Sequence, residues 1–375
     1  MINYVSNLPR ELRSGGFSAM NAAAAAALAS QYELHYVGPI DPPFIAAEKL
    51  ASKALRLLGR PGRFAFFSPR RLEGIAAEVA RKSRPDAALN FFHGFTPWIH
   101  TQSQRPYVAW SDCTFRDYID IYHARAAFDA ADLERIERAE GRWLRGAARV
   151  LLKCQWAAER AVRDYGLAPE RVSSVGSFGE IDPPERDAYA GGQGFAFVST
   201  DFAAKGGRTV LEAFASVRRE FPGVTLTVVG DAPASAPSVD GVIFTGFLRK
   251  ENAVEAAQMR QILASARALV HPTLSDVAPL IVVEAAYFGC PSVSSRRFAI
   301  PELVEHDSTG LLLEEPRDVT ALAAAMRRLL VDEDAYRAMR VAAWTQSRRL
   351  HSRARFDERL QAAVASVLPE GMEAR

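Results

Sequence analysis

The chain has 375 residues, of which 49% are hydrophobic and 24% charged, and its net charge is +2. This length suits two domains of about 100–200 residues each, and the composition excludes a disordered chain and a membrane-spanning one. Three cysteines lie far apart with no CxxC spacing, so the sequence predicts neither a disulfide framework nor a zinc site and favours a reducing cytoplasm.

Short apolar runs alternate with amphipathic, alanine-rich segments along most of the chain. This alternation is typical of parallel sheets with helices on both faces. The alanine run 22–27 follows the Gly15-Gly16 turn, and we predict a helix there rather than a secretory leader, because alanine is the strongest helix former. The strands predicted in the first half are 2–6, 33–37, 87–92, 106–110 and 149–152.

A stretch rich in glycine and proline, residues 176–194, separates this half from a second one with the same rhythm. The strands predicted in the second half are 195–199, 225–229, 242–245, 268–271 and 292–294, followed by helical stretches 319–330 and 334–360.

We therefore predict an α/β protein with two Rossmann-like doubly wound domains that face each other across a cleft. The expected ranges are 1–178 for the N-terminal domain, 179–345 for the C-terminal domain, and 346–375 for a helix that packs back toward the N-terminal domain.

Charge is concentrated between Lys49 and Arg84, where ten basic residues face two acidic ones among apolar side chains. A basic helix with an apolar face can bind an anionic membrane surface, which predicts a peripheral location at the inner face of the membrane. The alternative is a helix that packs on the first sheet with solvated charges. Nucleic acid is a poorer partner, because the region has no recognised reading motif and the pI is only about 8.4.

The segment from His271 to Pro291 carries the most chemical information. It is predicted to be a strand, a turn, and a helix with Pro279 at its first position and Gly289 just past its end. A helix N-terminus at the carboxyl end of a parallel strand suits a diphosphate. Glu284 could then accept the hydroxyl protons of a ribose, and Asp276 could bind a sugar hydroxyl.

A plainer interpretation gives Asp276 a turn-capping role and leaves Glu284 as a solvated helix residue. Against it, Glu284 lies within the apolar run 281–286, where an unpaired charge would be costly.

The same segment resembles the E-x7-E motif of family 4 glycosyltransferases, which have two Rossmann domains (the GT-B type). Pro301-Glu302-Leu303-Val304 and 307–312 resemble the motifs that follow it in that family. Trp110-Ser111-Asp112-Cys113-Thr114-Phe115 resembles the SDATF box of a bacterial polysaccharide-assembly branch.

The resemblance implies roles for individual residues. Glu284 would bind the donor ribose, Lys205 would neutralise the diphosphate, and Asp276 would orient the transferred sugar. The Gly15-Gly16 loop would approach the phosphates closely. The other residues expected at the donor are Gly246, Phe247, Leu280 and Ile281.

Three positions depart from the pattern of the family. Asp112 falls where many relatives have a histidine that touches sugar or acceptor; its alternative role is to cap the following helix. Thr200 stands where many relatives have an arginine, which Arg208 could replace. The turn 277–279 replaces the usual Gly-Phe-Gly, and Pro279 lacks an N–H group.

The implied activity is that of a retaining hexosyltransferase that uses a nucleoside-diphosphate-sugar and needs neither metal nor cofactor. The acceptor would be a glycan or lipid-linked molecule in cell-surface polysaccharide biosynthesis. The one formal DxD motif, Asp332-Glu333-Asp334, is interpreted as ordinary helix-end charge. Alternatives are a nucleotide-sugar epimerase of the same fold and a catalytically weak partner subunit of a polysaccharide-assembly complex. No G-x-G-x-x-G follows a predicted strand, which disfavours a dehydrogenase.

Overall fold

The computed structural model describes residues 1–12, 15–231 and 236–368, and the chain divides into two compact units. The first unit comprises residues 1–176 together with the segment from Asp357 onward, and the second comprises residues 177–356. The sequence-based ranges place the boundary after 178 and a separate helix from 346, whereas the contacts divide after Gly176 and again after Phe356.

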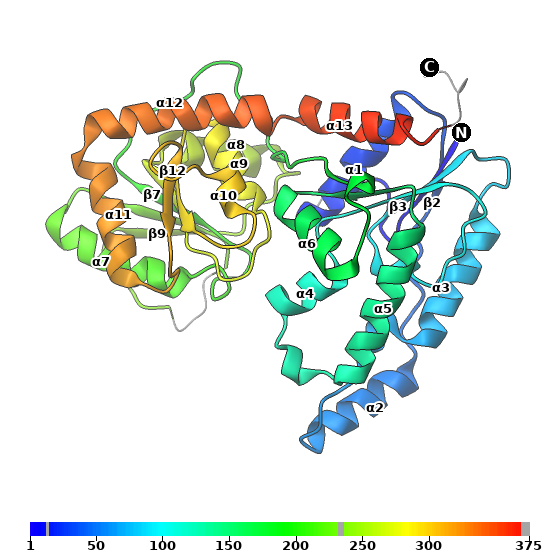
Figure 1. The fold of residues 1–375 in the computed structure, drawn as a ribbon. Coiled ribbons are helices and arrows are strands. Elements are labelled where there is room, and N and C mark those ends of the chain that lie inside the picture. Colours follow the sequence, from blue (N-terminus) through cyan, green and yellow to red (C-terminus); the bar gives the residue numbers. More distant parts are fainter. Residues whose placement is uncertain (13–14, 232–235, 369–375) are drawn as a thin grey trace. The chain divides into compact units, whose positions relative to one another are not determined.

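The first unit contains a six-stranded parallel sheet with helices on both faces (Figure 1). Its strand order is β2-β1-β3-β4-β5-β6. The strands are β1 Ile2–Val5, β2 Leu34–Val37, β3 Leu89–His93, β4 Tyr107–Ser111, β5 Arg149–Leu152 and β6 Val172–Ser174. The helices are α1 Gly16–Ala29, α2 Ala46–Leu57, α3 Pro69–Lys82, α4 Phe115–Tyr122, α5 Ala130–Gly146 and α6 Gln155–Tyr165, together with the part of α13 (Arg353–Ala365) that follows Phe356.

The second unit contains another six-stranded parallel sheet, in the order β12-β11-β10-β7-β8-β9. Helices α7 and α11 pack together on one face, and α8 and α9 lie on the other (Figure 1). The strands are β7 Phe195–Val198, β8 Leu226–Val229, β9 Val242–Gly246, β10 Ala268–His271, β11 Ser292–Ser295 and β12 Gly310–Leu313. The helices are α7 Gly207–Glu220, α8 Ala253–Ser265, α9 Leu280–Tyr287, α10 Ile300–Leu303, α11 Val319–Val331 and α12 Glu333–Leu350.

The strand order of the second unit locates its ligand-binding edge. The first strand of the unit, β7, pairs with the fourth, β10, so the chain runs outward in opposite directions from these two neighbours. In an open parallel sheet, the crevice at the carboxyl ends of such a pair is where ligands bind. The loops after β7 and β10 are therefore the first place to look for a site.

The end of the chain differs from the prediction of one long helix over 334–360. The helix breaks after Leu350, and α13 begins at Arg353. The hydroxyl of Ser352 accepts a hydrogen bond from the backbone N–H of Arg355, and serine favours this competing role at a helix start. In the first unit, the Gln361 side chain of α13 then donates to the carbonyl of Ala27 at 2.7 Å.

Helix α2 makes few contacts with the rest of its unit. Ser52 is its one buried residue, whereas Leu50 and Leu57 are 66% and 79% exposed. In Figure 1, α2 lies away from the strands. By contrast, α3 buries Leu72, Ile75 and Val79. For the basic region 49–84, the sequence left open a membrane-binding helix or a helix that packs on the first domain. Helix α3 packs on the domain, whereas α2 does not. Among the described residues, no helix combines the length and the apolar character needed to cross a membrane.

Candidate functional site

The loops after β7 and β10 lie against each other at the carboxyl edge of the second sheet. The N–H of Leu274 donates to the carbonyl of Ala204 at 2.9 Å. Gly206 has a φ of 80°, and a Cβ there would lie 2.5 Å from the carbonyl oxygen of Pro272. Only glycine combines this backbone conformation with so close an approach. Glycine at position 206 therefore allows the two loops to pack directly against each other.

Lys205 and Asp276, each predicted separately as a site residue, form a direct ion pair in this crevice. The Nζ of Lys205 lies 2.8 Å from Oδ1 of Asp276 and also donates to the carbonyl of Ser275 at 3.0 Å. Thr273 Oγ1 donates to Oδ2 of Asp276 at 2.9 Å, and His271 Nε2 lies 3.2 Å from the same oxygen. The carboxylate of Asp276 thus has a fixed orientation, set by three neighbours.

These neighbours keep Asp276 ionised. Burial alone would raise its pKa, but the hydrogen bond and charge of His271, together with Lys205, lower the pKa to about 2. At neutral pH Asp276 is therefore an acceptor of hydrogen bonds and has no proton to give to a leaving group.

This depressed pKa makes a pH-dependent contribution to stability. A carboxyl group whose pKa is lower in the folded state than in the unfolded state stabilises the folded protein at pH values above the unfolded-state pKa. This stabilisation is lost as the pH falls toward 2. The shift from 3.8 to about 2 corresponds to about 2 kcal/mol. We expect urea unfolding at pH 5 to show a cost of Asp276→Asn that shrinks by this amount at pH 2. A cost that stays constant with pH would contradict these contacts.

Glu284 lies in a second cluster and is fully buried on α9. Its Oε1 accepts from the Nζ of Lys250 at 2.6 Å and from the N–H of Glu180 at 2.8 Å. Lys250 also pairs with the carboxylate of Glu180 at 2.9 Å. Burial alone would lower the pKa of Lys250, but the charges of Glu284 and Glu180 raise it. The expectation that this carboxylate needs a partner in its apolar run is met by Lys250.

The other oxygen of Glu284 is unsatisfied. Among the described residues, Oε2 of Glu284 is buried and has no hydrogen-bond partner. A buried carboxylate oxygen without a partner is costly, and such groups mark functional positions or unfilled ligand sites.

Two helix ends complete the carboxyl edge of the sheet. Helix α7 begins after Gly206 and α9 after Pro279, and neither N-terminus has a side-chain capping hydrogen bond. Such ends attract anions, because their first N–H groups lack intrahelical partners. Pro279 was predicted to be the first residue of the helix, but it is the N-cap residue, and α9 begins one residue later. Leu280 and Ile281 therefore lie in the first turn. Gly289 follows the end of α9 with a φ of 64°, as predicted.

At the end of β9 lie the last two residues predicted at the donor. Gly246 has a φ of 74°, and its carbonyl accepts from the N–H of Gly230 at 2.9 Å. The neighbouring Phe247 side chain is half exposed. A ring left in solvent next to a ligand-binding edge is available for stacking.

The first unit holds the remaining predicted residues. Gly15 is the N-cap of α1 with a φ of 89°, and Gly16 is its first residue. Asp112 follows β4, where its Oδ1 accepts from the N–H of Cys113 at 2.9 Å. The alternative role of Asp112 as a helix cap is wrong, because Thr114 caps α4 by accepting from the N–H of Asp117.

Two other residues considered in the sequence, Arg208 and Asp332 of the triplet 332–334, have the contacts of ordinary surface residues. Arg208, offered as a substitute for an arginine at Thr200, is 83% exposed on its side chain and pairs with Glu212. In the Asp332-Glu333-Asp334 triplet, Asp332 caps α12 by accepting from the N–H of Ala335 at 3.0 Å. Asp332 therefore has the helix-end role expected of it.

Lys250, Glu180 and His271 were not identified as site residues from the sequence. Lys250 lies in the turn between β9 and α8, 34 residues before its partner Glu284, and no motif marks it. His271 is the last residue of β10, and this position at the carboxyl end of a strand is the one signal that could have indicated it.

Residues 192–332 match the family "Glycosyl transferases group 1". This stretch contains Lys205, Lys250, Asp276 and Glu284. The family match covers less than half of the chain.

Curated proteins with similar sequences are also glycosyltransferases. The chain is 26% identical over 213 residues to a D-inositol 3-phosphate glycosyltransferase of Segniliparus rotundus, covering 51% of this chain and 47% of the relative. It is 29% identical over 179 residues to an MMP alpha-(1→4)-mannosyltransferase of Mycolicibacterium hassiacum, covering 46% and 43%. The aligned parts thus span less than half the length of these relatives. Together with the family match, they support the glycosyltransferase superfamily.

Solved structures resemble nearly the whole chain. HepE of Anabaena, in complex with UDP-glucose, has a TM-score of 0.65 at 17% identity and covers 98% of this chain and 100% of that one. Sucrose-phosphate synthase of Thermosynechococcus elongatus has a TM-score of 0.67 at 16% identity, covering 97% and 98%. At such identities the likeness shows the fold. The predicted α/β class, with two Rossmann-like doubly wound domains of the GT-B type, is confirmed.

Proposed function

We propose that the chain is a retaining hexosyltransferase of family 4 that takes its sugar from a nucleoside-diphosphate-sugar without a metal ion. The observation that carries the proposal is the Lys205–Asp276 ion pair between two helix N-termini without side-chain caps. This arrangement combines a fixed positive charge with helix-end N–H groups where a diphosphate would bind. HepE, which has the same fold, is described with UDP-glucose bound.

In this proposal, the second unit stabilises the departing nucleoside diphosphate. Lys205 and the first turn of α7 would neutralise the charge that develops on the leaving phosphate. Preorganised donors of this kind supply the largest single part of many rate enhancements. Asp276, ionised and fixed by His271 and Thr273, would accept a hydroxyl of the transferred sugar. The leaving phosphate oxygen itself would accept the proton of the acceptor hydroxyl, with retention of configuration.

Glu284 would bind the ribose through its unsatisfied Oε2. The buried oxygen supports this role, since a ribose hydroxyl is a donor of the right kind. The hydrogen bond from the N–H of Glu180 to Oε1 fixes the carboxylate plane before the nucleotide arrives. Phe247 would lie at the nucleotide as an exposed ring.

The acceptor would be a glycan or a lipid-linked saccharide in cell-surface polysaccharide biosynthesis. In the first unit, Asp112 would contact the sugar or the acceptor, and the Gly15-Gly16 turn would approach the donor phosphates. The SDATF-like box supports this assignment. Among the curated relatives is a phosphatidylinositol monomannoside mannosyltransferase of Mycobacterium tuberculosis, whose named acceptor is a lipid.

Helix α2 is the part of the chain that suits a membrane surface. Its exposed Leu57 and the following Leu58, 79% and 75% exposed, are accompanied by Lys49, Lys53 and Arg56. Exposed apolar side chains among basic ones favour an anionic bilayer surface. We propose peripheral attachment through α2 at the inner face of the membrane.

We expect the protein to sediment with vesicles of anionic lipid at low salt and to be released at about 0.5 M salt, where screening is strong. The variant Leu57→Ser/Leu58→Ser should bind several times more weakly, and Val331→Ser, which removes an exposed valine of the second unit, should bind as before. No sedimentation at low salt, or equal sedimentation of both variants, would refute the membrane contact.

The donor is tested with a panel of UDP-, GDP- and ADP-sugars, followed by the rise in unfolding temperature. At least one donor should stabilise the protein, and incubation with that donor alone should leave the sugar configuration unchanged. Epimerised sugar without an acceptor would favour the epimerase. Binding without turnover across a full acceptor panel would favour a catalytically weak subunit.

A further inference from the structure

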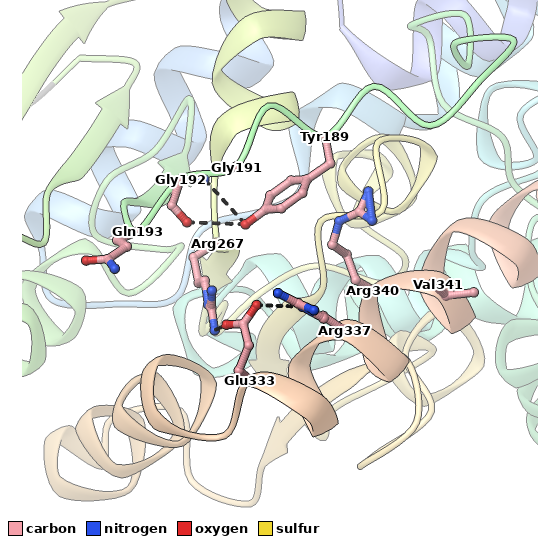
Figure 2. Close-up of a pocket in the computed structure, with 9 residues that line it drawn as sticks. All are labelled: Tyr189, Gly191, Gly192, Gln193, Arg267, Glu333, Arg337, Arg340 and Val341. Atoms are coloured by element: carbon pink, nitrogen blue, oxygen red, sulfur yellow. Dashed lines mark hydrogen bonds and ion pairs between the residues drawn. The ribbon is translucent and has the colours of Figure 1, made fainter.

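A pocket of about 710 Å³ opens at the opposite, amino-terminal edge of the second sheet. It lies between the segment 189–193 and the start of α12, and Figure 2 shows its lining. Arg267, at its base, immediately precedes β10 and donates its backbone N–H to Gly194. The pocket shares no residue with the candidate donor site. A volume of this size is in the range of small-molecule sites.

The charged lining of the pocket is three arginines against one glutamate. Arg267 and Arg340 are both buried, and their side chains are 7% and 9% exposed. The NH2 group of Arg267 donates to Glu333 at 2.6 Å, and the Nε of Arg337 donates to the other oxygen of Glu333 at 2.9 Å. Both terminal nitrogens of Arg340 instead donate to the carboxylate of Asp187. The side chain of Arg337 is 72% exposed, so most of its donors face solvent.

The two buried guanidinium groups also stack on tyrosine rings: Arg267 lies 3.6 Å from the ring centroid of Tyr336, and Arg340 lies 4.1 Å from that of Tyr189. Both groups are paired with carboxylates that are themselves about half exposed, Glu333 and Asp187. The Nε of Arg340 is buried and has no partner among the described residues. Guanidinium forks match carboxylate and phosphate groups, so the pocket offers more cationic donors than its own acids use.

The rest of the lining suits hydroxyl groups. Gly191 and Gly192 contribute backbone without side chains, and a Cβ at Gly192 would lie 2.0 Å from the carbonyl oxygen of Ser265. Gln193 adds an amide, which both donates and accepts. Figure 2 shows the Tyr189 ring along one wall, where it hydrogen-bonds to the backbone of Gly192 at 3.3 Å. Apolar lining is otherwise limited to Val341, so a lipid chain would not be matched.

We infer that this pocket binds a small anionic monosaccharide, one that carries a phosphate or a carboxylate group. The anionic group would be bound by the terminal nitrogens of Arg337, with the charge of Arg340 nearby, and the sugar hydroxyls would bind Gln193, Glu333 and the glycine backbone. Strand β10, about 13 Å long at ~3.3 Å per residue, separates the pocket from Asp276. A ligand here therefore leaves the donor edge free, and the site is independent of the proposed transferase reaction.

Isothermal titration with glucose 6-phosphate, glucuronate, glucose and inorganic phosphate tests the inference. The first two should bind, while glucose and phosphate alone should bind at least about tenfold more weakly, since each lacks half of the recognised groups. Arg337→Ala should weaken binding of the anionic sugars about tenfold or more. Val341→Trp, which replaces a half-exposed valine at the rim with a large ring, should block it.

Two matched variants make the test specific. Arg219→Ala removes an exposed arginine of α7, outside the pocket, and should leave binding unchanged. Lys205→Ala disables the candidate donor site and should also leave it unchanged. No binding of either anionic sugar, equal binding of phosphate alone, unchanged binding in both Arg337→Ala and Val341→Trp, or loss of binding in Lys205→Ala would overturn the inference. Failure of the transferase assay would not affect this result.

Discussion

Replacing Lys205 by alanine should lower kcat by at least about 100-fold, because the leaving diphosphate loses the fixed positive charge that Lys205 supplies in the crevice. Removal of a single preorganised donor at such a site costs ~10²–10³ in rate. The substrate KM should change less, since the charge on the phosphate grows as the bond to the sugar breaks. The measurement is the initial rate of nucleoside diphosphate release with donor and acceptor.

Arg208→Ala is the matched control for this variant. Arg208 is a cation near the start of α7, which follows the Lys205 loop. Its side chain is exposed and pairs with Glu212. Its loss should change the rate by less than about threefold, as expected for a surface ion pair. Equal losses in the two variants would show that general charge, rather than the position of Lys205, governs the rate. An unaffected Lys205→Ala enzyme would contradict the proposed role outright.

Glu284→Gln should abolish most of the stabilisation that the nucleotide-sugar confers. The amide keeps the shape of the side chain but replaces an acceptor oxygen with a donor, so it cannot accept the second ribose hydroxyl. A lost hydrogen bond to a charged group costs about 1.5–3 kcal/mol, which is a ~10–150-fold loss in donor affinity. The measurement is the rise in unfolding temperature over a donor titration.

The fold of this variant must be followed separately, because Glu284 is also the partner of Lys250. The carboxylate of Glu180, 2.9 Å from Nζ of Lys250, remains as a counter-charge, so the variant should still fold cooperatively. Glu212→Gln, at an exposed carboxylate of α7, serves as control and should keep the full donor response. A normal response in Glu284→Gln would refute the ribose contact.

Much of the fold could be predicted from the sequence because parallel strands read as short apolar runs. The runs 195–199 and 268–271 fall close to the bounds of β7 and β10. Two strands, β6 and β12, escaped prediction. Val172–Ser174 lacks the pattern, with one apolar residue in three, whereas Gly310–Leu313 has a run of three leucines that was assigned to a family motif and not to a strand. Their place at the sheet edges comes from tertiary pairing.

The candidate site was predicted as residues but not as contacts. Lys205 and Asp276 were both expected at the donor, yet they are 71 residues apart in the chain, and nothing in the sequence indicates that they pair. Only the neighbouring positions of β7 and β10 bring their loops together. Lys250 could not be predicted at all, because a lysine in a polar turn is the usual surface residue.

The pocket at the amino-terminal edge was beyond sequence reasoning for the same reason. Its arginines come from the start of β10 and from α12, and Tyr189 comes from the segment expected to be a linker. Glu333 belongs to a triplet interpreted as helix-end charge, which is correct for Asp332 but incomplete for Glu333. Residue type alone does not distinguish a solvated arginine from one that is buried beside a pocket.

We propose that the Lys205–Asp276 crevice transfers a sugar from a nucleotide to an acceptor. The most direct measurement is acceptor-dependent release of nucleoside diphosphate from the donor that stabilises the protein most, with product configuration followed by NMR. We predict release that requires the acceptor, a product with the donor's anomeric configuration, and loss of both in Lys205→Ala. Release that needs no acceptor, or an inverted product, would contradict the account.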